Sequence, residues 1–405
     1  MKTLIFVLVI FGLIDLYIFK GLSSVISGHS ENTRLWVNIV YWLISLICIG
    51  VLVYGLINRG NFRSSTTLSV IIGIFLTFFV PKLIFLAFHA MDDMVNLLSF
   101  GYSKLSSTDF SRRTFFTQIG MVAGSLMFGG MVYGILWGKF NFRVLREKID
   151  SPRIPQAFDG LKIVQISDAH LGSFAGDLDP VQRAVQMINE LDADLVVFTG
   201  DLVNVHASEA EPWIEVFSQI KAKYGKFSVF GNHDYADYGN FSSSEKSQSV
   251  TRLKEIHQLM GFRLLEDENV NITLDEQEIT LIGVHNWGKG FHQVGNLQVA
   301  RKNAPTDNFK ILLSHDPTHF EHQVKGHTDI DLTLSGHTHG MQMGIEIPAL
   351  NIKWSPVRFR YPRWAGLYEE NGQRLYINRG FGVLAFPGRV GMAPEITLLT
   401  LGSLT

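Results

Sequence analysis

Four long apolar segments dominate the first third of the chain. Each is about 17 to 23 residues long, and they cover residues 3–19, 35–57, 68–90 and 115–137. Segments of this length and composition are typical of helices that cross the hydrocarbon core of a bilayer. A cleaved signal peptide would explain only the first of them. The pattern therefore predicts an all-α transmembrane block of about four helices over residues 1–140.

Two charged residues interrupt these apolar segments. Asp15 lies in the first and Lys82, next to Pro81, lies in the third. Charged side chains are costly inside a bilayer, so the two residues are expected to face each other within the bundle. The alternative is that each lies near a helix end, with Lys82 snorkelling to the interface. The sequence leaves both interpretations open.

Beyond residue 140 the chain changes to short apolar runs. The run Ser151-Pro152-Arg153-Ile154-Pro155 is typical of a linker, which we place over residues 141–159. Helical periodicity follows over 179–191 and 209–223 and in a stretch that ends near residue 260. The predicted strands are 161–166, 195–199, 226–230, 262–265, 279–284, 310–313, 331–334, 374–378 and 395–401. Early β-α alternation followed by mostly strands predicts an α/β (α+β) domain over residues 160–405, with two packed sheets or one mixed sheet and helices outside.

Charge is unevenly distributed between the two parts. Residues 1–145 contain 11 Lys/Arg and 5 Asp/Glu, whereas residues 146–405 contain 24 and 32. An acidic C-terminal part argues against a nucleic-acid partner. Cys48 is the only cysteine, so no disulfide can form within the chain.

Polar residues of metal-ligand type follow five of the predicted strands. The central example is Val196-Val197-Phe198-Thr199-Gly200-Asp201, a buried strand that runs into Gly-Asp. Strand ends are where open α/β sheets bind ligands. The candidate ligands are Asp168, His170, Asp201, Asn232, His315, His337 and His339. Mixed oxygen and imidazole ligands suit Mn, Fe, Zn or Co.

The spacing of these residues carries further expectations. A kink is needed if Asp168 and His170 are to face one ion, and His337 and His339 could divide between two ions. Two metals about 3.5–4 Å apart need a shared ligand, and we choose the Asp201 carboxylate.

In this order, Asp-x-His, Gly-Asp, Gly-Asn-His-Asp, a strand-end His and Gly-His-x-His resemble the calcineurin-like metallophosphoesterase family. The resemblance covers roughly residues 160–400 and implies a two-sheet sandwich flanked by helices. It implies two divalent metal ions, one held by Asp168, His170, Asp201 and His339 and the other by Asp201, Asn232, His315 and His337. It also implies that His233 is a catalytic proton donor and not a ligand. Asp234 either orients His233 or caps the following turn.

Features near the C-terminus resemble the membrane-anchored bacterial branch of this family. They are Gly380-Phe381-Gly382 and Arg389 followed by Pro394-Glu395-Ile396. That branch includes enzymes that cleave the pyrophosphate of UDP-2,3-diacylglucosamine. A departure is Met341, where the branch more often has glycine, and this puts the shape of the substrate in doubt.

Three hypotheses for function follow. The first is hydrolysis of a lipid-linked phosphodiester or pyrophosphate by a metal-activated water. The apolar stretch over residues 341–364 supports it, and Trp354, Trp364 and Arg389 are the candidate substrate contacts. The second is a soluble nucleotide-type substrate with the helices as a simple anchor, and the third is a catalytically silent metal or ligand sensor. The lipid bilayer and a phosphoester substrate are the expected partners.

Two signals conflict on the membrane side of the catalytic domain. Seven Lys/Arg against five place it in the cytoplasm by the positive-inside bias. The run Ser111-Arg112-Arg113-Thr114-Phe115-Phe116 instead resembles a bacterial twin-arginine export signal. The alternative is that Arg112 and Arg113 simply flank a membrane helix. We favour a multi-pass protein of the bacterial inner membrane whose domain faces the extracytoplasmic side.

Overall fold

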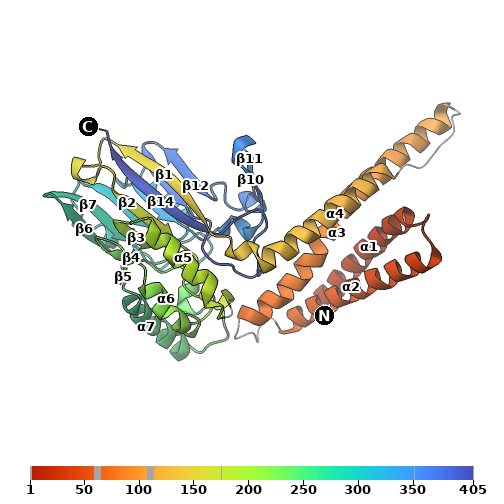
Figure 1. The fold of residues 1–405 in the computed structure, drawn as a ribbon, viewed down its shortest axis with the longest axis horizontal. Coiled ribbons are helices and arrows are strands. Elements are labelled where there is room, and N and C mark those ends of the chain that lie inside the picture. Colours follow the sequence, from red (N-terminus) through yellow and green to blue (C-terminus); the bar gives the residue numbers. More distant parts are fainter. Residues whose placement is uncertain (1, 59–64, 107–113, 175, 351, 405) are drawn as a thin grey trace. The chain divides into compact units, whose positions relative to one another are not determined.

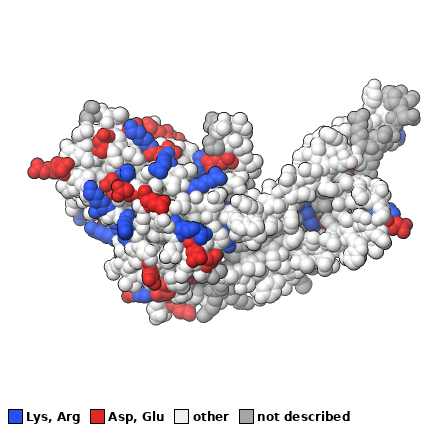
Figure 2. All heavy atoms as spheres, in the orientation of Figure 1, with Lys and Arg blue, Asp and Glu red and all other residues white. Residues whose placement is uncertain are grey.

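The computed structural model describes residues 2–58, 65–106, 114–174, 176–350 and 352–404 (Figure 1). The chain divides into a helical unit, residues 1–61 and 67–135, and a second unit that contains residues 136–405. Charged side chains are scattered over the visible face of the second unit and are sparse on that of the helical unit (Figure 2).

The helical unit consists of the four predicted helices. They are α1 (Lys2–Val25), α2 (Glu31–Asn58), α3 (Ser65–Ser106) and α4 (Phe115–Leu136). All four are long and apolar enough to cross a membrane. At 42 residues, α3 is longer than predicted, because Pro81 does not end it and it continues beyond the apolar segment. In that extension the Asp92 carboxylate accepts the backbone N–H of Phe116, 3.1 Å away, at the start of α4.

Asp15 and Lys82 face each other inside the helical unit. The Lys82 Nζ lies 2.7 Å from the Asp15 carboxylate, and the two side chains are only 13% and 8% exposed. The Lys82 ammonium also donates to the Ser45 hydroxyl, and the Tyr41 hydroxyl donates to the Asp15 carboxylate. The alternative placement near helix ends is wrong, because Asp15 lies in the middle of α1. Neither charge is left unpaired in the apolar interior.

The second unit is a sandwich of two six-stranded sheets. The first sheet has the order β1-β14-β2-β3-β4-β5 and the second the order β12-β13-β9-β8-β7-β6. The strands of the first sheet are β1 (Arg143–Ser151), β14 (Glu395–Ser403), β2 (Lys162–Ile166), β3 (Leu195–Phe198), β4 (Lys226–Ser228) and β5 (Arg263–Leu264). Those of the second are β12 (Gly366–Glu370), β13 (Gln373–Ile377), β9 (Leu332–Ser335), β8 (Phe309–Leu313), β7 (Gln277–Gly283) and β6 (Glu268–Leu274). A separate hairpin joins β10 (Ile345–Ile347) to β11 (Ile352–Trp354).

Alternation along the central strands builds the core between the sheets. In β3, Leu195 and Val197 pack against the second sheet, while Val196 and Phe198 pack on the opposite face. The helices α5 (Leu178–Glu190), α6 (Ile214–Ser218) and α7 (Ser243–Leu259) cover that outer face (Figure 1). Helix α8 (Leu297–Ala300) and a π-helical turn (Phe320–Val324) cover the outer face of the second sheet. The predicted two-sheet sandwich flanked by helices is therefore confirmed.

Two local predictions are wrong. The predicted linker contains strand β1, because residues 143–151 pair in parallel with β14 at the edge of the first sheet. The helix predicted over 209–223 is reduced to two 3-10 turns and the five-residue α6, with Pro212 in the second of those turns. Proline is compatible with the first turn of a helix but not with its interior.

Candidate metal centre

The predicted ligands meet where the central strands of both sheets end. Asp168 and His170 follow β2, Asp201 follows β3, and His337 and His339 follow β9. Two groups of side chains have ligand atoms within 4.8 Å of one another, namely Asp168, His170 and His339, and Asp201, His315 and His337. His337 and His339 thus fall into different groups. Between them, Thr338 turns away and donates to the Trp364 carbonyl at 2.6 Å.

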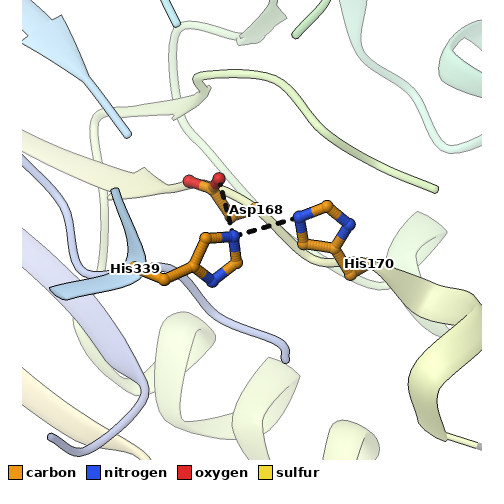
Figure 3. A group of neighbouring side chains, drawn as sticks. All are labelled: Asp168, His170 and His339. Carbon is orange, nitrogen blue, oxygen red and sulfur yellow. Dashed lines mark hydrogen bonds and ion pairs between the residues drawn. The ribbon is translucent and has the colours of Figure 1, made fainter. Parts of the chain in front are cut away.

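Figure 3 shows the first group, in which the two imidazoles point toward each other beside the carboxylate. The His170 Nε2 lies 3.1 Å from the His339 Nε2, which in turn lies 3.1 Å from an oxygen of Asp168. All three residues are buried. On the far side of its ring, the His170 Nδ1 lies 3.2 Å from the Val203 carbonyl, which fixes the imidazole orientation.

The second group repeats this arrangement. The His337 Nδ1 lies 3.2 Å from the His315 Nε2 and 2.9 Å from the Asn232 side-chain oxygen. The other ring nitrogen of His315 lies 2.7 Å from the Thr199 carbonyl, so its Nε2 is the free ligand atom. The Asn232 side-chain oxygen therefore lies beside this group, where it could supply a neutral oxygen ligand.

Asp201 lies between the two groups. One of its carboxylate oxygens is 3.1 Å from the His315 Nε2 and 3.6 Å from the His170 Nε2. Since these histidines belong to different groups, the Asp201 carboxylate can contact ligands of both.

The donor set fits cations. In each group two imidazole nitrogens face each other at hydrogen-bond distance. Two lone pairs in this position repel unless a proton or a cation lies between them. Burial by itself lowers the pKa of His315, but the carboxylates of Asp201 and Asp168 outweigh it and raise that pKa to about 10. Buried carboxylates beside facing imidazoles are therefore stabilised by a nearby positive charge, and divalent ions supply such a charge.

Backbone strain marks the same residues. Five of the seven predicted ligands have positive φ between 43° and 71°, namely Asp168, His170, Asp201, His337 and His339. Each such conformation costs about 1–3 kcal/mol in a non-glycine residue and is typical of functional sites. The kink expected between Asp168 and His170 is therefore present.

The carboxylates of Asp201 and Asp168 each lie against a glycine that has no side chain to block them. A Cβ at Gly231 would lie 2.2 Å from an Asp201 oxygen, and one at Gly336 would lie 2.2 Å from an Asp168 oxygen. Neither distance is compatible with an alanine, so the Gly-Asn-His-Asp and Gly-His-x-His motifs require glycine for steric reasons.

His233 lies beside the two groups without belonging to either. Its Nδ1 is 2.6 Å from the Asn204 carbonyl, and its ring stacks on Tyr238 with 4.1 Å between centroids. Burial lowers the pKa of His233, while the charge of Asp201 raises it. The Nδ1 contact leaves the Nε2 free to reach a substrate.

Asp234 does not orient His233. Its carboxylate accepts backbone N–H groups from Asp201, Leu202 and Gly231, each at 2.8–2.9 Å. It therefore ties together the two loops that carry Asp201 and Asn232, and the orienting contact of His233 comes from the Asn204 carbonyl instead.

Two tyrosines at the site were missed in the sequence analysis. The Tyr361 hydroxyl lies 2.8 Å from the His337 Nε2, and the Tyr238 hydroxyl accepts from the Asn232 amide at 2.7 Å. Both residues belong to irregular segments with no motif, so no sequence signal could have identified them.

The structure corrects two of the three predicted substrate contacts. The Arg389 guanidinium is buried and donates to the carbonyls of Arg379, Gly380 and Gly382, so it has no free face for a phosphate. Trp364 is also buried, packed among Val357, Tyr361 and Met392. Trp354 is exposed, and its contact with the substrate stays a prediction.

We expect Arg389→Ala to destabilise the domain without changing substrate affinity. The loop that Arg389 holds lies directly behind Asp168 and His339, since a Cβ at Gly380 would contact both. Hydrogen bonds to a charged group contribute about 1.5–3 kcal/mol each. Thermal unfolding should show a lower Tm, while KM for a small diester should stay within twofold, roughly the scatter of an unperturbed site. A large rise in KM with an unchanged Tm would restore the substrate-contact role. Arg389→Lys should restore Tm only in part, because a lysine ammonium cannot reproduce the planar set of N–H donors of the guanidinium.

A two-sheet sandwich with buried carboxylates and imidazoles at its strand ends defines a metal-dependent phosphoesterase domain. The comparisons with known proteins agree, and the chain belongs to the calcineurin-like metallophosphoesterase family. Residues 161–341 match the family model described as calcineurin-like phosphoesterase. Residues 1–139 match a model described as the transmembrane domain of a probable calcineurin-like phosphoesterase.

Three relatives illustrate the range of similarity. The metallophosphoesterase YkuE of Bacillus subtilis is 31% identical over 304 residues, which are 72% of this chain and 98% of that protein. A transmembrane protein with metallophosphoesterase domain from Danio rerio is 29% identical, over 67% of this chain and 60% of that protein. A metallophosphoesterase of Campylobacter jejuni is 24% identical over 98% of this chain and 96% of its own length. Membrane association and phosphoester hydrolysis follow from the two family models. The resemblance to enzymes acting on UDP-2,3-diacylglucosamine is not shown and stays a prediction.

Proposed function

We propose that the chain is a membrane-anchored, dinuclear phosphoesterase that hydrolyses a phosphodiester or pyrophosphate. Asp168, His170 and His339 would hold one divalent ion and Asn232, His315 and His337 would hold the other, and the Asp201 carboxylate would serve both. The ions are Mn, Fe, Zn or Co, in keeping with the mixed oxygen and imidazole donors. The observation that carries the proposal is the pair of buried imidazole contacts at 3.1 and 3.2 Å, which leave a place for a cation in each group.

Divalent ions in such a site lower the pKa of water and neutralise the charge on phosphoryl oxygens. The chain supplies the remaining functions. His233, oriented by the Asn204 carbonyl, donates a proton to the leaving oxygen. Tyr361 keeps His337 in position, and Asp234 keeps the loop that carries Asp201 in position.

Turnover of bis-p-nitrophenyl phosphate tests this proposal. The purified full chain is stripped with a chelator and reloaded with Mn²⁺, Zn²⁺ or Co²⁺, and metal content and hydrolysis are measured together. Hydrolysis that returns with close to two equivalents of metal is the expected result. Two bound equivalents without turnover of this or any lipid-extract substrate would favour the silent sensor instead.

The proposed substrate is lipid-linked. Trp354 is exposed within an apolar stretch that follows the last ligand, and the four helices keep the domain at a bilayer. Incubation with a lipid extract, followed by mass spectrometry of phosphate-containing products, identifies the substrate.

We expect Trp354→Ala to raise KM for an acylated substrate roughly tenfold and to leave KM for a small chromogenic diester unchanged. Full burial of a large apolar side chain contributes about 1.5–3 kcal/mol, and loss of part of that burial corresponds to roughly a tenfold change. Phe359→Ala is the matched variant, because Phe359 is also exposed and belongs to the same apolar stretch of the chain. Equal damage to both substrates would indicate a structural role for Trp354 and favour the soluble-substrate alternative.

We further propose that the domain faces the extracytoplasmic side of a bacterial inner membrane. The supporting Arg112-Arg113 pair lies outside the described residues, so the proposal depends on sequence alone. Added protease should digest the wild-type domain in intact spheroplasts, and replacement of the pair by Lys-Lys should protect it. Protection of the wild-type domain until the membrane is permeabilised would place it in the cytoplasm.

A further inference from the structure

The β10–β11 hairpin has its polarity reversed relative to an ordinary surface hairpin. Ile345 pairs with Trp354 and Ile347 with Ile352, so these four side chains share one face of the two-stranded ribbon. All four side chains are exposed, with 38–52% of each residue accessible. Leu350, in the connection between the strands, is 65% exposed. An exposed and continuous apolar face of this kind marks an interaction site.

The two polar residues of the hairpin bind the domain and hold the hairpin in place, although Lys353 is itself exposed. Glu346 pairs with Lys353 across the ribbon. The Glu346 carboxylate accepts from the Arg379 guanidinium at 2.6 Å. Lys353 donates to the Ala365 carbonyl and lies 5.0 Å from the Trp364 ring centroid. The charged side chains are therefore used for attachment to the domain, and the apolar ones are left outside.

The hairpin lies at the end of the domain where the chain arrives from α4. Arg143, the first residue of β1, is in register with Glu395. The Arg379 guanidinium bonds the Glu395 carboxylate at 2.7 Å and, through its other terminal nitrogen, Glu346 of the hairpin. Only residues 137–142 separate the end of α4 from β1. Six residues span at most about 20 Å, so the connection between α4 and the first strand of the domain is short.

Basic residues follow the hairpin directly in the chain. Arg358 and Arg360 are both exposed and flank Phe359, which is 85% exposed. Arginines beside aromatic and aliphatic side chains suit the boundary between anionic headgroups and acyl chains. The next residue, Tyr361, contacts His337 of the metal centre.

We propose that the apolar face of the β10–β11 hairpin inserts into the headgroup and acyl boundary of the bilayer that holds the four helices. This second membrane contact would bring the Tyr361 and His337 side of the metal centre toward the interface where lipid-linked phosphates reside. The inference goes beyond the proposed function, because bilayer contact by the hairpin does not depend on any reaction at the metals.

The single cysteine makes a direct test possible. In a Cys48→Ser background, Leu350→Cys is labelled with an environment-sensitive fluorophore, and the full chain is reconstituted into nanodiscs that contain anionic lipid and doxyl-labelled lipid. Val299→Cys is the matched control, since Val299 is 52% exposed on α8 over the outer face of the second sheet. An interfacial apolar face is buried about 5–10 Å into the headgroup and acyl boundary, so insertion should bring the label at position 350 near the doxyl groups and quench it at least about twofold. The label at position 299 should not be quenched.

Three results would overturn the inference. The first is equal quenching at positions 350 and 299. The second is quenching at 350 that appears only after an acylated substrate is added, which would assign the face to the substrate chain. The third is self-quenching that grows with the protein-to-lipid ratio, which would assign it to a second copy.

Two further variants separate folding from docking. Ile347→Asp puts a charge on the apolar face and should abolish quenching at position 350. Turnover of a small diester should be kept, because Ile347 and Leu350 are not part of the metal centre. The same label in an Asp201→Asn background should remain quenched even though that variant is inactive. If the phosphoesterase proposal fails, the result on membrane insertion still stands. If insertion is not observed, the phosphoesterase proposal is likewise unaffected.

Discussion

Asp201→Asn is expected to abolish hydrolysis and to reduce metal binding in both groups of ligands. The Asp201 carboxylate lies 3.1 Å from His315 and 3.6 Å from His170, so one of its oxygens faces ring nitrogens of both groups. An amide removes the negative charge but keeps the shape and one oxygen. Stabilisation of charge by the metals contributes several kcal/mol to the transition state, so the rate should fall by at least about 10³-fold.

Metal analysis distinguishes bridging from terminal ligation. After chelation and reloading, Asp201→Asn should retain one equivalent or less, whereas loss of a terminal ligand such as Asn232 should affect one ion. Asp192→Asn is the matched control, because Asp192 also has positive φ but its side chain is 98% exposed. Two full equivalents in Asp201→Asn would disprove the bridging assignment.

His233→Ala is expected to keep both metals and lose most of kcat. His233 belongs to neither group of ligand atoms, yet its ring contacts His170 at 5.0 Å between centroids. Removing a general acid typically costs about 10²–10⁴-fold. The loss should be smaller for p-nitrophenyl esters than for alkyl esters, because a good leaving group needs little protonation.

The leaving-group dependence is the decisive readout for His233. A merely structural histidine would reduce the rates of both classes of ester equally. The exposed His327→Ala serves as the control and should behave like the wild type. If His233→Ala instead loses metal, His233 is a ligand and the proposed division of roles is wrong.

Strand ends were the most predictable part of this molecule. A short apolar run with polar residues on both sides, such as 195–198, is typical of a buried strand, and the polar residue after it then lies at the edge of the sheet. This is why the sequence pattern was enough to predict that Asp168, Asp201 and His315 lie together. The same logic identified the four helices, since apolar segments of their length have few other stable environments.

Side-chain direction was much less predictable. Arg389 and Trp364 were assigned to the substrate by residue type, but the structure uses the first to bind backbone carbonyls and the second to fill a core. A fork of N–H donors suits a carbonyl cluster as well as a phosphate, and sequence does not distinguish them. Strand β1 was missed for a related reason, because Arg143, Arg146, Glu147 and Lys148 give an edge strand the composition of a loop.

The ion pair between Asp15 and Lys82 has a consequence for how the protein is made. The two partners are 67 residues apart in the chain, so α1 emerges from the ribosome well before α3. An aspartate at the centre of a lone helix opposes its insertion by about 2.5–3.5 kcal/mol. The charge of Asp15 is therefore compensated only after α3 has been made. A stable position of α1 in the membrane consequently depends on the later helix α3.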